Sequence, residues 1–328
     1  MYRELKTETT YTKTMIFFSV LTFLFGLATC FVGNIFLPFS TAFCACLFLF
    51  ENPEKRILSY IVPLVVMVIN VSINRLESII GFEFIILGLL MALLYAKKVS
   101  KSESAAYLTF IISFFVIFSL YINGIFACKS FEISRVIAYY DELLNAFRFN
   151  LVELLSSTKI TDSSGSTEYF MSSEVAEIVF NAGLNLLPSF MIGYSFLLAG
   201  ISIKLFAFLA RNRCKYGILK RYANFVPSSI TAYFYILASI VGFLVAGENV
   251  FEIAMMNIAN ILMLPFAYVG IKYLKTMALI TGRKTFFCII IIAGLIMAPA
   301  AASRLISYLG VYFAITHNKV STGKNLEM

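Results

Sequence analysis

The sequence predicts an all-α, polytopic transmembrane helical bundle with about eight or nine spans and one external amphipathic helix. Of its 328 residues, 60% are hydrophobic and only 13% are charged, whereas soluble domains are about half apolar and roughly a quarter charged. The mean hydropathy is +0.87. Apolar stretches close to the roughly 20 residues that one bilayer crossing needs recur from end to end. Together these observations exclude an ordinary soluble domain.

Apolar runs between charged or turn-rich breaks define the individual spans. The predicted spans are 15–32, 34–50, 57–73, 79–96, 105–126, 176–210, 228–247, 253–271 and 286–315. The tripeptide VGN (32–34) predicts a tight hairpin between the first two. Two stretches are long for a single crossing: 176–210, which contains Pro188, and 286–315, which contains Pro299. Nine crossings put the C-terminal tail opposite the N-terminus and eight put it on the same side, and the sequence leaves both open.

The basic residues predict the orientation. Lysine and arginine gather in the N-terminal tail and in alternate loops, such as 97–101 and 211–221, while the loops between are almost free of them. Because short basic loops stay on the cytoplasmic side, the N-terminus is expected there. The net charge of +8 then reflects topology, and no nucleic-acid partner is expected.

Three regions follow from this division. Residues 1–126 form an N-terminal membrane half of five helices, 127–175 an extracytoplasmic segment, and 176–328 a C-terminal membrane half. Within the middle segment, residues 133–155 predict an amphipathic helix, because apolar residues recur at steps of three and four. That stripe consists of Val136, Tyr140, Leu143, Phe147, Leu151 and Leu154. The Ser/Thr-rich run 156–169 predicts a flexible loop, and Ser173 is the expected cap of the following helix.

Two functions of the amphipathic helix stay open. It either lies on the outer leaflet or caps the bundle, with its stripe against lipid or protein, or it is a lid over a cavity or a docking helix for a partner. The candidate lid or docking residues are Tyr140, Leu143, Phe147 and Leu151.

Polar side chains inside apolar spans are the candidate ligand-binding residues, because polar groups in hydrocarbon are costly. Glu83 lies about one turn into its span, and Lys204 and Arg304 are the other ionisable groups in such spans. Two pairs of amides each share one helix face. These pairs are Asn181 with Asn185 and Asn257 with Asn260. Glu83 and the amides each have a structural alternative, namely a hydrogen bond that joins two helices, and Lys204, near the cytoplasmic end of its span, can instead extend its ammonium group to the membrane surface.

The sequence predicts a protein that is not an enzyme. GxSxG, HExxH, Walker A and GxGxxG motifs are all missing. The single histidine is His317, and the six cysteines form no CxxC pair. No catalytic residues, metal site or cofactor are therefore expected.

The order of these features resembles the YybS-type family of bacterial integral membrane proteins, which carry a domain of unknown function. The resemblance rests on NIFLPFSTAF (34–43), GFEFIILGLLMALLYAKKVS (81–100), the external amphipathic segment and NILMLPFAYVGIKYLK (260–275). It implies a multi-pass protein of the bacterial plasma membrane. The family is distantly similar to the substrate-binding subunits of energy-coupling-factor transporters and to the membrane scaffold MreD.

Two hypotheses follow. In the first, the chain is a transport-related subunit that binds a small solute among Glu83 and the four amides, with an ATPase supplied by other chains. In the second, it is a scaffold or regulator of envelope machinery that docks a partner on 133–155. A scaffold tolerates apolar replacements of the buried polar residues, whereas a carrier does not.

Overall fold

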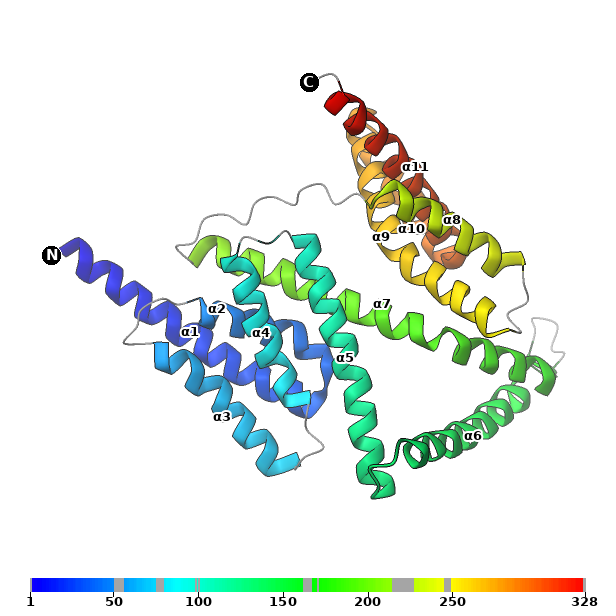
Figure 1. Ribbon diagram of the computed structural model, residues 1–328, viewed down its shortest axis with the longest axis horizontal. Coiled ribbons are helices and arrows are strands. Elements are labelled where there is room, and N and C mark those ends of the chain that lie inside the picture. Colours follow the sequence, from blue (N-terminus) through cyan, green and yellow to red (C-terminus); the bar gives the residue numbers. More distant parts are fainter. Residues whose placement is uncertain are drawn as a thin grey trace. The chain divides into compact units, whose positions relative to one another are not determined.

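The computed structural model describes residues 2–49, 56–74, 80–97, 99, 101–161, 167–169, 171–213, 227–244 and 249–326. Nearly all of them are helical (Figure 1). Within these residues, four apolar stretches are long enough to cross a membrane, at Lys13–Val32, Glu103–Cys128, Ser173–Ala210 and Val250–Ile280, and six shorter apolar helices accompany them. The predicted helical membrane bundle is confirmed.

The chain divides into two compact units, which are described separately. The first consists of Met1–Phe180 with Tyr194–Ala223, and the second of Asn181–Gly193 with Asn224–Met328. The first unit contains α1 (Tyr2–Val32), the 3₁₀ helix η1 (Asn34–Phe36), α2 (Leu37–Phe48), α3 (Arg56–Asn74), α4 (Ile80–Ala96), α5 (Lys101–Cys128) and α6 (Ile133–Ser157). The helix α7 (Ser173–Arg213) contributes to both units. The second unit adds α8 (Ser229–Leu244), α9 (Val250–Ile280), α10 (Lys284–Met297) and α11 (Pro299–Leu326). The three-region division at 126 and 175 concerns membrane topology and stays a prediction.

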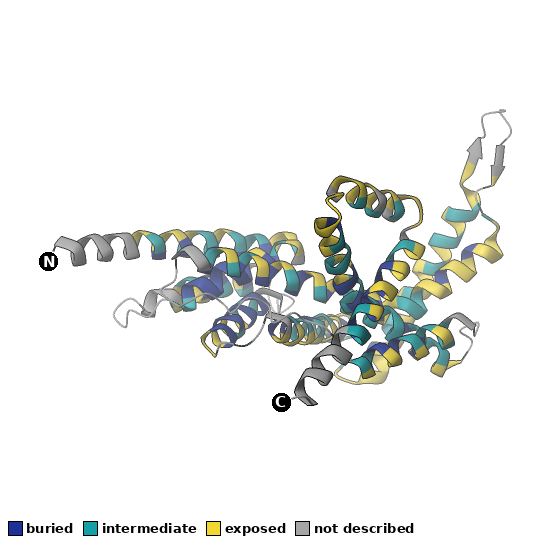
Figure 2. Cartoon of the chain, turned by 90° about the horizontal axis from the view of Figure 1, so that it is seen from above, coloured by how far each residue is buried: buried dark blue, intermediate teal, exposed yellow. Residues whose placement is uncertain are grey.

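The first unit is built on the hairpin of α1 and α2. Gly33 turns the chain with a φ of 103°, a conformation that is open to glycine, and the predicted VGN hairpin is confirmed. Across the hairpin, the buried hydroxyls of Thr29 and Ser40 share a hydrogen bond of 2.9 Å. Helix α4 packs on α2 at Gly88, where a Cβ would come within 2.9 Å of the Cβ of Cys44. Buried residues, dark blue in Figure 2, gather on these helices.

The Ser/Thr-rich segment differs from the expected flexible loop. Its two ends pair as antiparallel strands, β1 (Lys159–Thr161) and β2 (Thr167–Tyr169), in the register Lys159↔Tyr169. The tip between the strands lies outside the described residues. The Lys159 ammonium lies 5.3 Å from the centre of the Tyr169 ring. The loop prediction is wrong at both ends of the segment, because Ile160 and the neighbouring threonines are β-branched and favour extended backbone in spite of the polar composition.

The predicted cap of α7 is one residue off. The hydroxyl of Ser172, and not that of Ser173, accepts a hydrogen bond of 3.3 Å from the backbone N–H of Val175. The Ser172 carbonyl also accepts the first helical hydrogen bond, from Ala176. Either serine satisfies the composition rule for a cap, so only the backbone geometry distinguishes them.

In the second unit, α9 and α11 approach each other at two glycines. A Cβ on Gly270 would collide with the backbone carbonyl of Ile306, and a Cβ on Gly310 with that of Phe266. Small residues at such crossings let transmembrane helices come into direct backbone contact. Helix α8 packs beside them, with the ring of Tyr235 stacked on Phe266 at 5.1 Å. Figure 1 shows α8, α9 and α11 side by side.

The predicted single stretch 286–315 is wrong, because the chain breaks at Ala298. There φ and ψ are −145° and 68°, outside the helical region, and Pro299 starts the next helix. Proline lacks an N–H and disfavours helical backbone in the residue before it. The stretch therefore forms two apolar helices, α10 and α11.

This break predicts where the C-terminal tail lies. If all ten of the described apolar helices cross and α6 does not, the chain makes ten crossings. With the N-terminus on the cytoplasmic side, as the sequence predicts, the C-terminal tail then lies there too. We expect green fluorescent protein fused after Met328 to fluoresce in cells, and alkaline phosphatase at the same point to be inactive. Fusions after Ala298 should give the reverse result. Phosphatase activity at the C-terminal fusion would mean an odd number of crossings.

Candidate functional site

A small, partly open cavity lies in the second unit between α8, α9 and α11, and two of its lining residues, Arg304 and Tyr308, are exposed. Its volume is about 60 Å³. The lining residues are Tyr235, Ser239, Gly242, Met256, Ala259, Asn260, Met263, Arg304 and Tyr308. Since a liquid water molecule occupies about 30 Å³, the cavity holds a few water molecules or one small polar group. The lining mixes hydroxyl, amide and guanidinium groups with methionines, as ligand pockets commonly do.

Local packing holds this cavity open. On one side, Gly242 brings α8 close to α9, since a Cβ there would lie 3.2 Å from the Cα of Met256. On another, the hydroxyls of Tyr235 and Ser307 share a buried hydrogen bond of 2.9 Å that ties α8 to α11. The Tyr308 ring packs 5.8 Å from that of Tyr235. Three helices are thus fixed around the polar groups.

The predicted amide candidates separate in the structure. Asn260 is half-buried and lines the cavity, and its side chain has no hydrogen-bond partner among the described residues. Asn181 is exposed and Asn185 half-buried on α7, and neither lines the cavity. Asn257 is buried and points to α7, as described next. Only one of the four amides is therefore placed at this cavity.

Asn257 joins α9 to α7 through the backbone next to Pro188. Its side-chain oxygen accepts a hydrogen bond of 3.0 Å from the N–H of Ser189, and its amide nitrogen donates to the carbonyls of Asn185, at 2.6 Å, and of Ile253, at 2.9 Å. The N–H of Ser189 and the carbonyl of Asn185 are the pair that an uninterrupted helix would join directly. The amide of Asn257 bridges them, so both of its donors are already used.

Glu83 lies in the first unit, apart from the amides of the second. It is only 2% exposed, and its Oε1 has no hydrogen-bond partner among the described residues. The adjacent Phe84 packs against Gly26 of α1, so apolar groups surround this part of α4. An unpaired carboxylate in such surroundings costs several kcal/mol. Glu83 is thus either a neutral acid or a carboxylate that pairs with a bound cation, and its predicted ligand role stays a prediction.

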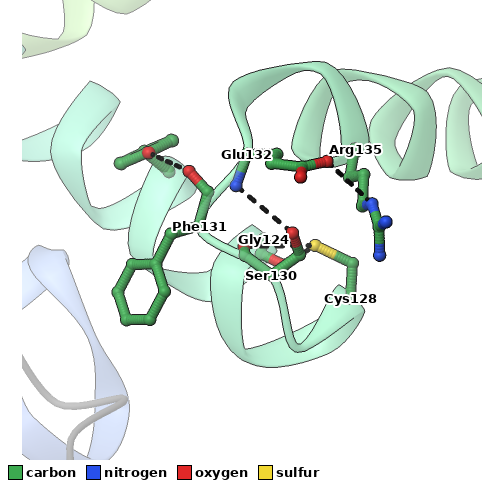
Figure 3. Close-up of polar contacts among 7 residues, drawn as sticks. Gly124, Cys128, Ser130, Phe131, Glu132 and Arg135 are labelled. Carbon is green, nitrogen blue, oxygen red and sulfur yellow. Dashed lines mark hydrogen bonds and ion pairs between the residues drawn. The ribbon is translucent and has the colours of Figure 1, made fainter.

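The amphipathic helix α6 is present and begins at a tight corner after α5 (Figure 3). The N–H of Glu132 donates to the hydroxyl of Ser130 at 3.2 Å, and the Glu132 carboxylate pairs with Arg135 at 2.9 Å. The first turns of α6 then pack on α5, where a Cβ on Gly124 would come within 2.5 Å of Val136.

Tyr140, one of the lid or docking candidates, belongs to this junction. Its hydroxyl donates to the Leu120 carbonyl at 2.6 Å. Burial, followed by the charges of Tyr139 and Cys128, raises the pKa of Tyr140 above its usual value, so the hydroxyl stays protonated and can donate. This residue therefore anchors α6 to α5.

The other candidates of α6 lie further along the stripe. Leu143 is 52% exposed and Phe147 57% exposed, while Leu151 is half-buried. Beside them, Arg148 pairs with Glu177 of α7 at 3.1 Å, and the Phe147 ring lies 6.2 Å from that of Phe180. Contacts thus hold α6 in its first turns and at Phe147 and Arg148, while Leu143 between them is exposed.

Sequence reasoning missed most of the cavity. Tyr235 and Ser239 are four apart, as are Arg304 and Tyr308, so each pair shares a helix face. That spacing is a usable signal, but only once 286–315 is divided at Ala298 so that Arg304 lies near the start of its own helix. Among the described residues, no three His, Cys, Asp or Glu side chains gather as a metal site.

We predict that Asn257→Leu destabilises the protein. The change removes the bridge at Ser189 and Asn185, and polar groups left unpaired in a bundle cost about 1–3 kcal/mol. The midpoint of thermal unfolding in detergent should fall by several degrees, measured by circular dichroism because the chain contains no tryptophan. Asn181→Leu, at an exposed amide, is the matched control and should leave the midpoint unchanged. An unchanged midpoint for Asn257→Leu would show that the bridge adds no net stability.

Comparison with known proteins gives one match. Residues 14–312 match DUF2232, a family of predicted membrane proteins. No curated protein and no solved structure matches the chain. The expected membership in a membrane family defined by a domain of unknown function is confirmed. Because the match covers most of the chain, the protein belongs to the DUF2232 family of predicted membrane proteins.

Proposed function

We propose that this protein is a non-enzymatic membrane component that binds a small polar solute in the cavity between α8, α9 and α11. One observation carries the proposal. The cavity brings Arg304, Asn260 and Ser239 together inside a unit of apolar helices. Polar and charged groups within membrane helices usually face a partner, a cavity or a transport path. The Asn260 amide has no hydrogen-bond partner among the described residues, so it is available to a ligand.

The cavity lies toward one end of the second unit. Its residues come from the last part of α8 and from the first halves of α9 and α11. Lys272 and Lys275 lie in the second half of α9, and Arg283 follows the end of that helix. By the positive-inside rule the basic end is cytoplasmic. The cavity then opens toward the extracytoplasmic half of the membrane, as suits a subunit that receives solute from outside.

In this proposal the protein acts with other chains. The distant similarity of the YybS-type family to energy-coupling-factor substrate-binding subunits suggests a transport-related role, with ATP hydrolysis supplied by a separate ATPase subunit in a bacterial plasma membrane. The chain itself contributes solute binding. It has no Walker A motif of its own.

The second candidate function is a scaffold or regulator of envelope machinery. It is favoured by the apolar stripe of α6, where Leu143 and Phe147 remain more than half exposed although contacts of Tyr140 and Arg148 hold the helix. Such a helix presents an apolar face, and partner proteins commonly bind amphipathic helices through that face.

Replacement of Asn260 tests the first candidate. We expect native mass spectrometry of the protein, purified from its own host in mild detergent, to detect a retained small molecule of one defined mass. In Asn260→Leu its occupancy should fall roughly tenfold, because a polar group of the ligand loses its partner. Asn181→Leu, the same change outside the cavity, should retain it. Equal occupancy in wild type and Asn260→Leu would exclude the cavity as the site.

Charge on the α6 stripe tests the second candidate. Leu143→Asp with Phe147→Asp should abolish co-purification of a stoichiometric protein partner while the chain still inserts into the membrane. The matched control is Asn145→Asp with Asn150→Asp, which adds the same two charges at exposed polar positions. If the partner still co-purifies with the Leu143→Asp, Phe147→Asp variant, the scaffold hypothesis is wrong.

A further inference from the structure

The cavity of the second unit carries one positive charge and no negative one. Of its nine lining residues, only Arg304 is charged. Arginine stays protonated in proteins under all ordinary conditions. Among the described residues no carboxylate forms an ion pair with Arg304. Within the described residues, the cavity therefore contains a positive charge with no negative partner.

Arg304 lines the cavity as an exposed residue near the start of its helix. Arg304 lies in the second turn of α11, in a helix whose apolar part runs over Ala300–Thr316. A cation among apolar helices costs several kcal/mol unless it reaches water, headgroups or an anion. A bound anion is one such partner, and the planar guanidinium matches the two oxygens of a carboxylate or phosphate.

Neighbouring groups complete the same chemistry. Asn260 of the facing helix α9 can donate from its amide, and Tyr308, four residues after Arg304, can donate from its hydroxyl on the same face of α11. Neither side chain has a hydrogen-bond partner among the described residues. An anionic group here could accept from all three donors, whereas a cation would be repelled by Arg304, the one charged lining residue.

We infer that the ligand of this cavity bears a carboxylate or phosphate group, which Arg304 holds as a charge-assisted pair with Asn260 and Tyr308 beside it. This inference rests on the proposed solute-binding function and names its ligand class. The volume of about 60 Å³ admits one such group, so the remainder of a larger ligand extends out of the cavity. The same chemistry is presented by a soluble anion and by the headgroup of an anionic phospholipid.

The test uses the full chain, delipidated in mild detergent, and follows its thermal unfolding. The soluble probes are acetate and inorganic phosphate, titrated against chloride at constant ionic strength. The lipid probe is phosphatidylglycerol, with phosphatidylcholine as its neutral counterpart. We expect one probe class to raise the unfolding midpoint of the wild-type protein, and this class identifies the source of the anion.

Substitutions at Arg304 assign the effect to the cavity. In Arg304→Gln the apparent affinity for that probe should fall at least roughly tenfold, as expected for a lost charge-assisted pair, and in Arg304→Lys it should fall less. Lys204→Gln removes a positive charge from the apolar helix α7 and should leave the affinity unchanged. If Arg304→Gln does not fold, the comparison of Arg304→Lys with wild type decides.

The outcomes separate this inference from the function on which it rests. Anion binding that is equal in wild type and both Arg304 variants overturns the inference. The inference also fails if no anion raises the unfolding midpoint while the wild-type protein retains an uncharged solute that Asn260→Leu loses. That result would still support the cavity as a binding site. If no solute is retained and no probe acts, both the inference and the proposed function fail.

Discussion

A polar group in the hydrocarbon of a membrane must find its partner within the protein, because no water is available there. This constraint organises the described part of the chain. The hydroxyls of Thr29 and Ser40 join α1 to α2, those of Tyr235 and Ser307 join α8 to α11, and the amide of Asn257 joins α9 to α7. In each case a pair of polar groups fixes which faces of two apolar helices meet, and apolar packing then follows.

The same constraint separates polar residues that build the fold from those that are available for function. Asn257 and Asn260 are only three residues apart, and they differ completely in this respect. Asn257 donates both amide hydrogens to backbone carbonyls. Asn260 lines the cavity, and its side chain has no hydrogen-bond partner among the described residues. Arg304 and Glu83 are the ionisable counterparts of Asn260, since neither is paired with an opposite charge among the described residues. A functional role is best sought at residues whose bonding capacity the fold leaves unused.

The helix α6 differs from the apolar helices, because it is amphipathic and connects two of them, α5 and α7, in the chain. Its first turns are held by a glycine contact and by the Tyr140 hydroxyl, and its later turns by an ion pair to α7. Such anchoring fixes the direction in which the remaining apolar residues point. A freely moving lid would not need both anchors, so the arrangement suits a rigid surface better than a gate.

The sequence by itself determined the membrane class, the helical architecture, the first hairpin and the amphipathic helix. These depend on composition and on periodicity within one segment, which are local properties. Pro299 is a local reason for a break in 286–315, but Pro188 and Pro265 lie inside unbroken helices, so only the tertiary structure decided that this stretch divides at Ala298. It also decided which amides face a neighbouring helix and which face a cavity. Residues four apart share a face, but the sequence does not say what lies opposite that face, since this depends on how three helices separated in the chain pack together.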